Sequence, residues 1–192
     1  MESTDRARVE AERPDDAAKL RPDDAAERPD DADAVRAAWS RLLPGVDTEP
    51  VEIVFRVLRA ARLIERHSDR QLAAAGLTRP ELELLMLLRR SDAALSPTAI
   101  ADALLFTAPA TTKRLSALEA RGLLSRVVNP DDRRGSLVTL TESGRRLVER
   151  VLPEQLALEA ELLGGLSPAE RSRIAAALRT LLAAVSPSTP VE

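Results

Sequence analysis

Residues 95–140 carry helix, turn and strand signals in an order that restricts the chain to few folds. A serine followed by a proline starts a short helix at residues 96–104. A second helix, residues 107–121, follows a threonine that can cap it and ends before a glycine. An arginine-rich turn then separates two segments rich in leucine, valine and threonine, which predicts a hairpin of strands 123–128 and 136–140. This order predicts a winged helix-turn-helix, a fold that places its second helix in the major groove of DNA.

Long helices are predicted on both sides of this 78–141 winged helix-turn-helix DNA-binding region. Ala, Leu and Val carry almost all of the 44% apolar residues, and only 2% are aromatic, a composition that favours helices over strands. The expected fold class is therefore mainly α with a small β-hairpin wing. Residues 51–75 and 142–185 are assigned to dimerisation helices, because their apolar stripes can face a second copy. Capping boxes at Thr78–Glu81 and Ser167–Glu170 mark two of the helix starts.

The N-terminal region divides into an acidic tail and an appended helix. Residues 1–33 hold three imperfect copies of Arg-Pro-Asp-Asp-Ala-Ala, with a proline in each and no apolar face to bury. We predict a disordered, solvated tail, and a short-period solenoid is disfavoured because nothing would form its core. Residues 34–46 are predicted to form an appended N-terminal helix that carries Trp39 and that Asp33 can cap.

The charge of the chain is unevenly distributed, although its formal net charge is only −3. Residues 1–50 hold 8 basic and 14 acidic side chains, whereas residues 107–146 hold 8 basic and 4 acidic ones. Positive charge therefore gathers on the predicted DNA-reading unit, as attraction to phosphates requires.

Several classes of function are disfavoured by what the sequence lacks. With no cysteine and one histidine, a disulfide or a thiolate metal site is excluded, and a histidine zinc site is not expected. No catalytic Ser/His/Asp set or glycine-rich phosphate loop is found, so neither an enzyme nor a cofactor is expected. No apolar run is long enough to span a bilayer, and the acidic start lacks the features of a signal peptide. We expect a cytoplasmic protein without a membrane partner.

The open face of helix 107–121 predicts which residues contact DNA. Its N-terminal half offers short polar side chains, which let the backbone approach base edges while their donors reach them. The residues expected to contact bases or nearby phosphates are Thr107, Thr112, Lys113 and Ser116. Taken alone, the pattern also fits an ordinary amphipathic helix with a solvated face. The preceding helix and the following hairpin favour DNA reading.

The tip of the hairpin adds two candidate DNA contacts. Adjacent Arg133 and Arg134 suit phosphates or a narrow minor groove, which attracts arginine electrostatically. Asp132 is expected to hold Arg134 in a structural ion pair while the other arginine reaches outward. The alternative is surface ion pairing alone, which contributes little.

The sequence from Asp132 to Gly144 reads Asp-Arg-Arg-Gly-Ser-Leu-Val-Thr-Leu-Thr-Glu-Ser-Gly. It resembles the wing signature of the MarR family of bacterial transcription regulators, which has Asp-x-Arg, then Val-x-Leu-Thr and Gly. Two further stretches resemble that family's recognition helix and its exit: Thr112-x-Arg114-Leu115 and Leu118-Glu119-x-x-Gly122-Leu123. The resemblance covers about residues 51–185. It implies a homodimeric repressor that binds double-stranded DNA at a pseudo-palindromic operator.

A narrower resemblance is to the urate-responsive branch of that family. It implies an effector pocket formed by Trp39, Glu83, Arg90 and Arg114, and release of DNA by a small anion such as urate, a related purine or an aromatic acid. Two arginines can bind such an anion in a bidentate manner, and the tryptophan offers a stacking face. The alternative is that the acidic residue and the two arginines form ordinary interhelical ion pairs.

Two other functions stay open from sequence alone. The first is a sequence-tolerant architectural DNA-binding protein, and the second is a metabolite-binding module without a DNA function. Competition by unrelated DNA separates the first from a specific repressor, since equal competition favours the architectural protein.

Overall fold

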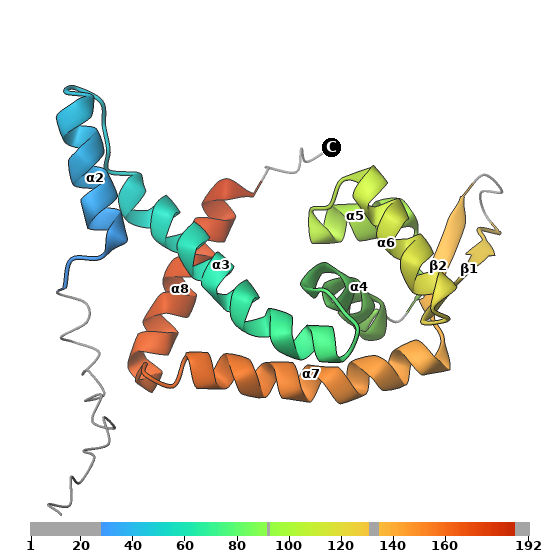
Figure 1. The fold of residues 1–192 in the computed structure, drawn as a ribbon. Coiled ribbons are helices and arrows are strands. Elements are labelled where there is room, and N and C mark those ends of the chain that lie inside the picture. Colours follow the sequence, from blue (N-terminus) through green and yellow to red (C-terminus); the bar gives the residue numbers. More distant parts are fainter. Residues whose placement is uncertain (1–27, 92, 131–134, 187–192) are drawn as a thin grey trace, which may run out of the picture. The chain divides into compact units, whose positions relative to one another are not determined.

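The computed structural model describes residues 28–91, 93–130 and 135–186, in two compact units. The elements of the larger unit, residues 30–164, are α2 (Asp31–Leu42), α3 (Val51–Ala74), α4 (Arg79–Arg90), α5 (Pro97–Leu104), α6 (Ala108–Ala120), β1 (Leu124–Val128), β2 (Ser136–Leu140) and α7 (Glu142–Leu162) (Figure 1). In the other unit, α8 spans Pro168–Val185. The described chain is mostly helical with one two-stranded antiparallel hairpin, so the predicted fold class is confirmed.

The core of the larger unit forms around α4. This helix packs against α3, α5, α7 and β2. Its buried residues are all leucines: Leu82, Leu84, Leu85, Leu87 and Leu88. The predicted capping box is present at its start, where the side chain of Glu81 accepts from the Thr78 backbone N–H at 2.8 Å. Because α4 supplies so much of the core, the elements packed around it, α5 and β2 among them, are firmly supported.

Helices α5 and α6 form the helix-turn-helix as predicted. Ser96 caps α5 by accepting from the backbone of Ala99 at 3.1 Å, and Thr107 caps α6. Gly122 follows α6 with a φ of +67°, the left-handed conformation expected after a helix end. Leu105, in the turn between the two helices, also has a positive φ, of 54°.

The hairpin pairs β1 with β2 from Leu124 opposite Leu140 to Val128 opposite Ser136. Leu95 adds a short third pairing, exchanging two backbone hydrogen bonds of 3.1 and 2.8 Å with Val138. The hairpin therefore connects to the segment before α5 as well as to α7, and Figure 1 shows it beside α6. The predicted tip residues, Asp132, Arg133 and Arg134, lie outside the described residues.

The start of α2 corrects the sequence prediction. The helix begins at Asp31, not at Ala34, and its cap is Asp30 and not Asp33. The carboxylate of Asp30 accepts from the backbone of Ala32 and Asp33, while Asp33 accepts from the backbone of Asp30 at 2.7 Å. This reciprocal capping box, formed by two aspartates, extends the helix by one turn. The rest of the predicted tail, residues 1–27, lies outside the described residues.

Helix α8 begins at the second predicted capping box, in which Ser167 Oγ and Glu170 Oε2 lie 2.6 Å apart. It has no buried residue, and its exposed apolar side chains include Ile174, Leu178, Leu182 and Val185. Among the helices of the described chain, none is long and apolar enough to cross a membrane.

Candidate nucleic-acid interface

Helix α6 is anchored on one face and open on the other. Thr111, Leu115 and Leu118 are buried, and at most 1% of the surface of each residue is exposed to solvent. Thr112 and Lys113 are exposed on the N-terminal half, where a recognition helix contacts base edges. A polar surface of this kind, held by a fully buried apolar stripe, can enter a groove without loss of its packing.

Thr107 combines an exposed position with a structural role. Its hydroxyl accepts from the backbone of Ala110 at 3.4 Å and so caps α6, and its carbonyl accepts from the Thr111 hydroxyl at 3.1 Å. A capping hydroxyl uses an oxygen lone pair, and its own proton stays free to donate to an outside acceptor.

Arg126 of β1 braces the wing against α6, a contact that sequence reasoning missed. Its guanidinium donates to the Ser116 hydroxyl at 3.0 Å, and its Nε lies 3.0 Å from a carboxylate oxygen of Glu119. The contact with Glu119 is an ion pair without hydrogen-bond alignment, and the Arg126 side chain is only 22% exposed. Ser116 was predicted to contact DNA, and the brace fixes its rotamer while it accepts from Arg126. The only sequence signal was a basic residue in the strand that follows the recognition helix.

The four residues predicted to bind an effector come from three helices. Trp39 lies on α2 with 47% of its surface exposed, and Arg90 is exposed at the end of α4. The Arg114 guanidinium carbon lies 4.5 Å from the centre of the Phe106 ring, a cation–π contact within the helix-turn-helix. Among the ion pairs of the described residues, none joins two of the four. Within one protomer, therefore, these four residues are not joined to one another by ion pairs.

Glu83 instead belongs to a polar chain that connects three helices. It accepts from Arg79 Nε at 3.0 Å, and Arg79 also donates to Glu159 of α7 at 2.8 Å. Glu159 accepts from the buried amide of Gln155, whose nitrogen donates at 2.8 Å to the hydroxyl of Ser68 on α3. Sequence reasoning missed these contacts, since they join residues as much as 87 positions apart.

The charges in this chain of contacts stabilise one another. Burial disfavours the charged form of Arg79, but its hydrogen bonds to Glu159 and Glu83 raise its pKa above the usual value. Burial likewise opposes the charge on Glu159, yet hydrogen bonds from Gln155 and Arg79 lower its pKa. The Gln155 side-chain oxygen is buried without a hydrogen-bond partner. The junction of α3, α4 and α7 is thus held by charged pairs and not by apolar packing alone.

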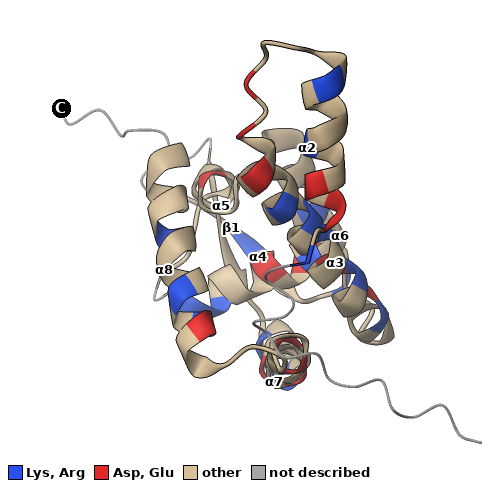
Figure 2. Cartoon of the chain, turned by 90° about the vertical axis from the view of Figure 1, so that its left-hand side faces the viewer, with Lys and Arg blue, Asp and Glu red and all other residues tan. Residues whose placement is uncertain are grey.

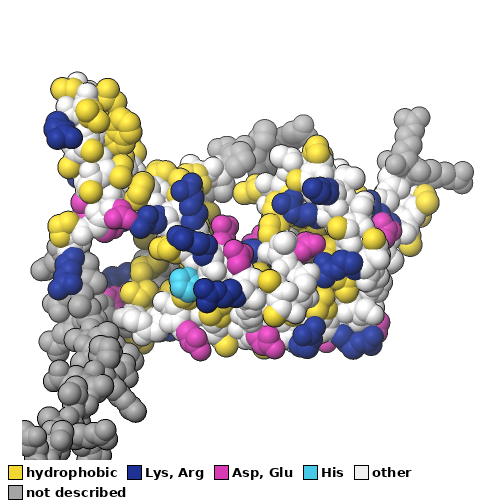
Figure 3. Space-filling model, viewed as in Figure 1, with side chains coloured by type: hydrophobic (Ala, Val, Ile, Leu, Met, Phe, Trp, Pro, Cys, Tyr) yellow, Lys and Arg dark blue, Asp and Glu magenta, His cyan; other side chains and the backbone are white. Residues whose placement is uncertain are grey.

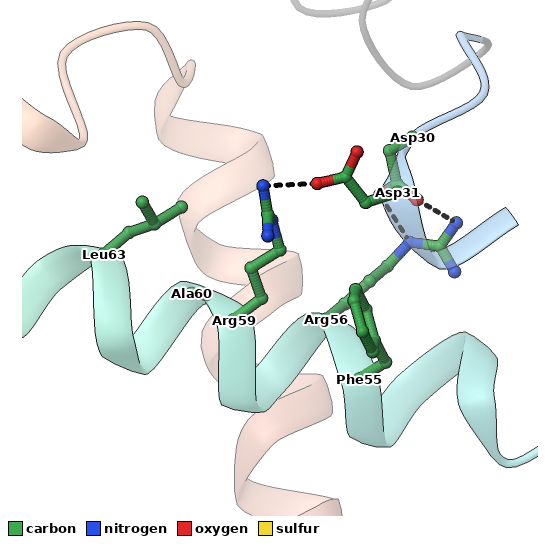
Figure 4. A pocket seen from close by; sticks show the side chains of 7 residues that line it. All are labelled: Asp30, Asp31, Phe55, Arg56, Arg59, Ala60 and Leu63. Carbon is green, nitrogen blue, oxygen red and sulfur yellow. Dashed lines mark hydrogen bonds and ion pairs between the residues drawn. The ribbon is translucent and has the colours of Figure 1, made fainter. Parts of the chain in front are cut away.

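Ion pairs hold α2 on α3. Arg56 donates to Asp30 at 2.9 Å and to Asp33 at 3.0 Å, and Arg59 pairs with Asp31. Figure 2 shows acidic positions at the start of α2 close to basic positions of α3. The contacts border a pocket of about 450 Å³ (Figure 4), lined by Asp30, Asp31, Phe55, Arg56, Arg59, Ala60 and Leu63. Its charged lining consists of the paired side chains themselves, so the pocket lies at the seam where α2 docks on α3.

Comparisons with known proteins agree with this architecture. A family model described as MarR family matches residues 75–135. The transcriptional regulator PecS of Dickeya dadantii is 33% identical over 142 residues, which cover 73% of this chain and 86% of PecS.

Two solved structures have similar folds. Sco3205 of Streptomyces coelicolor, a MarR family regulator in complex with DNA, is 27% identical with a TM-score of 0.67, over 74% of this chain and 96% of Sco3205. BpsR of Bordetella bronchiseptica, whose DNA binding is regulated by 6-hydroxynicotinic acid, is 30% identical with a TM-score of 0.62, over 67% of this chain and 91% of BpsR. The extent of the match with PecS, together with the anchored recognition helix and its paired wing, shows that the chain belongs to the MarR family of winged helix-turn-helix transcriptional regulators.

Proposed function

We propose that this protein is a ligand-responsive repressor that binds a pseudo-palindromic operator as a homodimer and leaves it when a small anion binds. The observation that carries the proposal is α6, whose exposed Thr112 and Lys113 stand on a buried stripe beside the wing. Sco3205, with the same fold, has been solved in complex with DNA. Thr107 and Ser116 assist in this reading, and Arg133 or Arg134 reaches the minor groove or the phosphates.

Exposed apolar surface supports the homodimer. On α3, six large apolar residues are between 36% and 52% exposed: Ile53, Val54, Val57, Leu58, Leu63 and Ile64. On and after α2, hydrophobic side chains also gather at the surface (Figure 3), among them Trp39, Leu42, Leu43 and Val46. A contiguous apolar surface of this kind marks an interaction site. A second copy covers it and also supplies the second recognition helix for the other operator half-site.

An anionic effector is supported by the chemistry of the four predicted residues. Exposed Arg90 offers a bidentate donor, and Arg114 connects any ligand that it touches to α6 itself. BpsR shows that a small aromatic acid regulates DNA binding in a protein of this fold. The proposed effector is urate, a related purine or an aromatic acid. It acts by binding the DNA-free state more tightly than the DNA-bound state.

The test is a gel shift at fixed salt on the DNA upstream of the protein's own gene, titrated with urate, xanthine and 6-hydroxynicotinate. We expect a discrete protein–DNA complex, and we expect at least one of these anions to dissociate it. The variant Arg90→Ala should bind the DNA normally but need more of the anion, with Arg62→Ala, on the exposed side of α3, as its matched control. A complex that ignores every anion would contradict the effector, while failure to form a complex would contradict the repressor.

An architectural, sequence-tolerant DNA binder is the alternative that this experiment also addresses. Unrelated competitor DNA is added to the same complex at equal mass. A repressor should bind its operator about 10³-fold or more tightly than it binds this competitor. Equal competition by the two DNAs would favour the architectural protein.

A further inference from the structure

Leu105, in the turn between α5 and α6, is the most exposed large apolar side chain of the described chain. It is 89% exposed, whereas every other large hydrophobic residue is at most 67% exposed. It stands two positions before Thr107, the cap of the recognition helix. An apolar side chain is therefore presented to solvent at the edge of the surface proposed to meet DNA.

The backbone around Leu105 directs that side chain outward. Its N–H donates to the carbonyls of Ala101 and Asp102, and the N–H of Phe106 donates to the Ala101 carbonyl at 2.9 Å. Leu104, on one side, packs against the hydrophobic core. Phe106, on the other side, lies under Arg114 of α6. Both neighbours turn towards the protein, and Leu105 alone turns away.

The conformation of Leu105 is unfavourable for its residue type. Its φ of 54° and ψ of 36° lie in the left-handed region, and Leu105 is the only non-glycine residue of the described chain with a positive φ. Glycine or asparagine is usual at such a helix end, because a branched side chain is strained there. The leucine gains no burial in exchange, so neither helix capping nor packing explains it. The backbone of Leu105 caps α5, as any residue here could, but its exposed side chain adds strain without packing, which points to a functional role.

We propose that Leu105 contacts the operator and reads the C5-methyl group of a thymine near the N-terminus of α6. The inference rests on the proposed DNA-binding function and adds a specificity-determining residue outside the recognition helix. Apolar side chains recognise thymine through this methyl group, which no other DNA base carries in the major groove. The hydrophilic residues of α6 read hydrogen-bonding groups, whereas Leu105 reads apolar surface.

The test uses three substitutions at this one position. Leu105→Gly and Leu105→Asn remove the apolar contact and fit the left-handed conformation, while Leu105→Met keeps an apolar side chain of similar volume. Affinity is measured by fluorescence anisotropy on the footprinted operator and on operators in which single thymines are replaced by deoxyuridine, which lacks the methyl group. Thermal melting of each variant confirms folding, and Leu105→Gly should melt no lower than the wild type.

The wild type and Leu105→Met should bind the operator about fivefold more weakly when one particular thymine in each half-site is replaced by deoxyuridine. For Leu105→Gly and Leu105→Asn the same replacement should change nothing, since the partner of the methyl group is gone. The proposal is overturned if Leu105→Gly and Leu105→Asn bind the operator with the same affinity as the wild type. It is also overturned if they lose affinity equally on thymine and deoxyuridine operators, which indicates a backbone contact. A wild type without a specific operator would refute the repressor proposal instead, and footprinting detects that first.

Discussion

Gly144 shows how a single residue sets the distance between two elements. It lies in the first turn of α7, where its N–H donates to the capping hydroxyl of Thr141 at 3.1 Å. A Cβ placed on this glycine would stand 1.9 Å from the backbone oxygen of Leu123, which follows the recognition helix. The family-like Thr-Glu-Ser-Gly sequence thus has a steric reason here: the start of α7 approaches the exit of α6 too closely for any side chain.

The first prediction is that Gly144→Ala lowers the free energy of unfolding by roughly 1–3 kcal/mol, because α7 must shift away from rigid backbone. Urea denaturation followed by circular dichroism measures this change. Gly165→Ala is the matched control, since a Cβ there meets no atom within 4 Å. Equal stability of the two variants would contradict the close approach.

At the same scale, Arg126 connects β1 to α6 through Ser116 and Glu119. The second prediction is that Arg126→Ala destabilises the protein by about 1 kcal/mol, because it removes a charged hydrogen bond and leaves Glu119 unpaired. It should also weaken operator binding, since the wing and Ser116 lose their fixed position. Thermal melting and anisotropy measure the two effects. Arg146→Ala, which breaks a pair that is 65% exposed on both sides, should change stability little.

At the scale of elements, α2 depends on electrostatic contacts more than on burial. Its only buried residue is Ala32, while its carboxylates face Arg56 and Arg59 across the seam with α3. Trp39, the one tryptophan of the chain, lies on this helix and is a natural reporter of its docking.

The third prediction concerns the arginine at the centre of this seam. Arg56→Ala removes the partner of Asp30 and Asp33, so α2 should detach and acrylamide should quench Trp39 more strongly. Far-ultraviolet circular dichroism should change little. Arg62→Ala, on the same helix, takes part in none of the ion pairs found among the described residues and should leave the quenching unchanged. Quenching that is equal in the two variants would show that contacts other than those of Arg56 suffice to hold α2.

The fourth prediction is a loss of α2 docking in acid. The hydrogen bond from Arg56 lowers the pKa of Asp30, and hydrogen bonds from Arg56 and Arg36 lower the pKa of Glu52. A carboxyl group whose pKa is lower in the folded state stabilises it above the unfolded pKa, about 4, and loses this effect as the pH falls further. Trp39 quenching should therefore be constant near neutral pH and rise below about pH 4. In Arg56→Ala this acid transition should be absent.

At the scale of the whole molecule, the proposed function requires two copies, since one recognition helix covers one half-site. The fifth prediction is that Val54→Asp, which places a charge on the exposed apolar face of α3, shifts the protein from dimer to monomer in sedimentation velocity. Operator affinity should fall with it. Arg70→Asp lies about 160° around the helix from that site and should stay dimeric. A dimeric Val54→Asp would place the interface elsewhere.

The polar chain from Ser68 to Glu83 also belongs to this scale. It joins α3 and α7, the proposed dimerisation helices, to α4, which supports the DNA-reading unit. An effector that donates a hydrogen bond to Glu83 competes with Arg79 for that carboxylate and so acts on the same junction. The geometry therefore offers a physical connection between the proposed effector residues and the dimer, whichever anion is bound.

The helix caps and boundaries were largely predictable from the sequence because they depend on neighbours three or four positions apart, and the wing strands because their composition and the turn between them are local. Thr78 with Glu81, Ser167 with Glu170, and the left-handed Gly122 were all confirmed. The start of α2 was not, since a capping box of two aspartates lies outside the usual pattern of serine or threonine with glutamate. The proposed DNA-contacting residues of α6 were found on an exposed face for the same local reason.

By itself, the sequence determined the order of elements, the winged helix-turn-helix and membership of the family, because periodicity, caps and turns are local properties of the chain. Only the tertiary structure decided which charges meet. Arg126 braces Ser116, Arg79 joins Glu83 to a glutamate 80 positions from the arginine, and Leu105 turns outward in a strained conformation. Such pairings depend on how helices pack against each other, and no spacing along the chain encodes a distance between side chains so far apart in sequence.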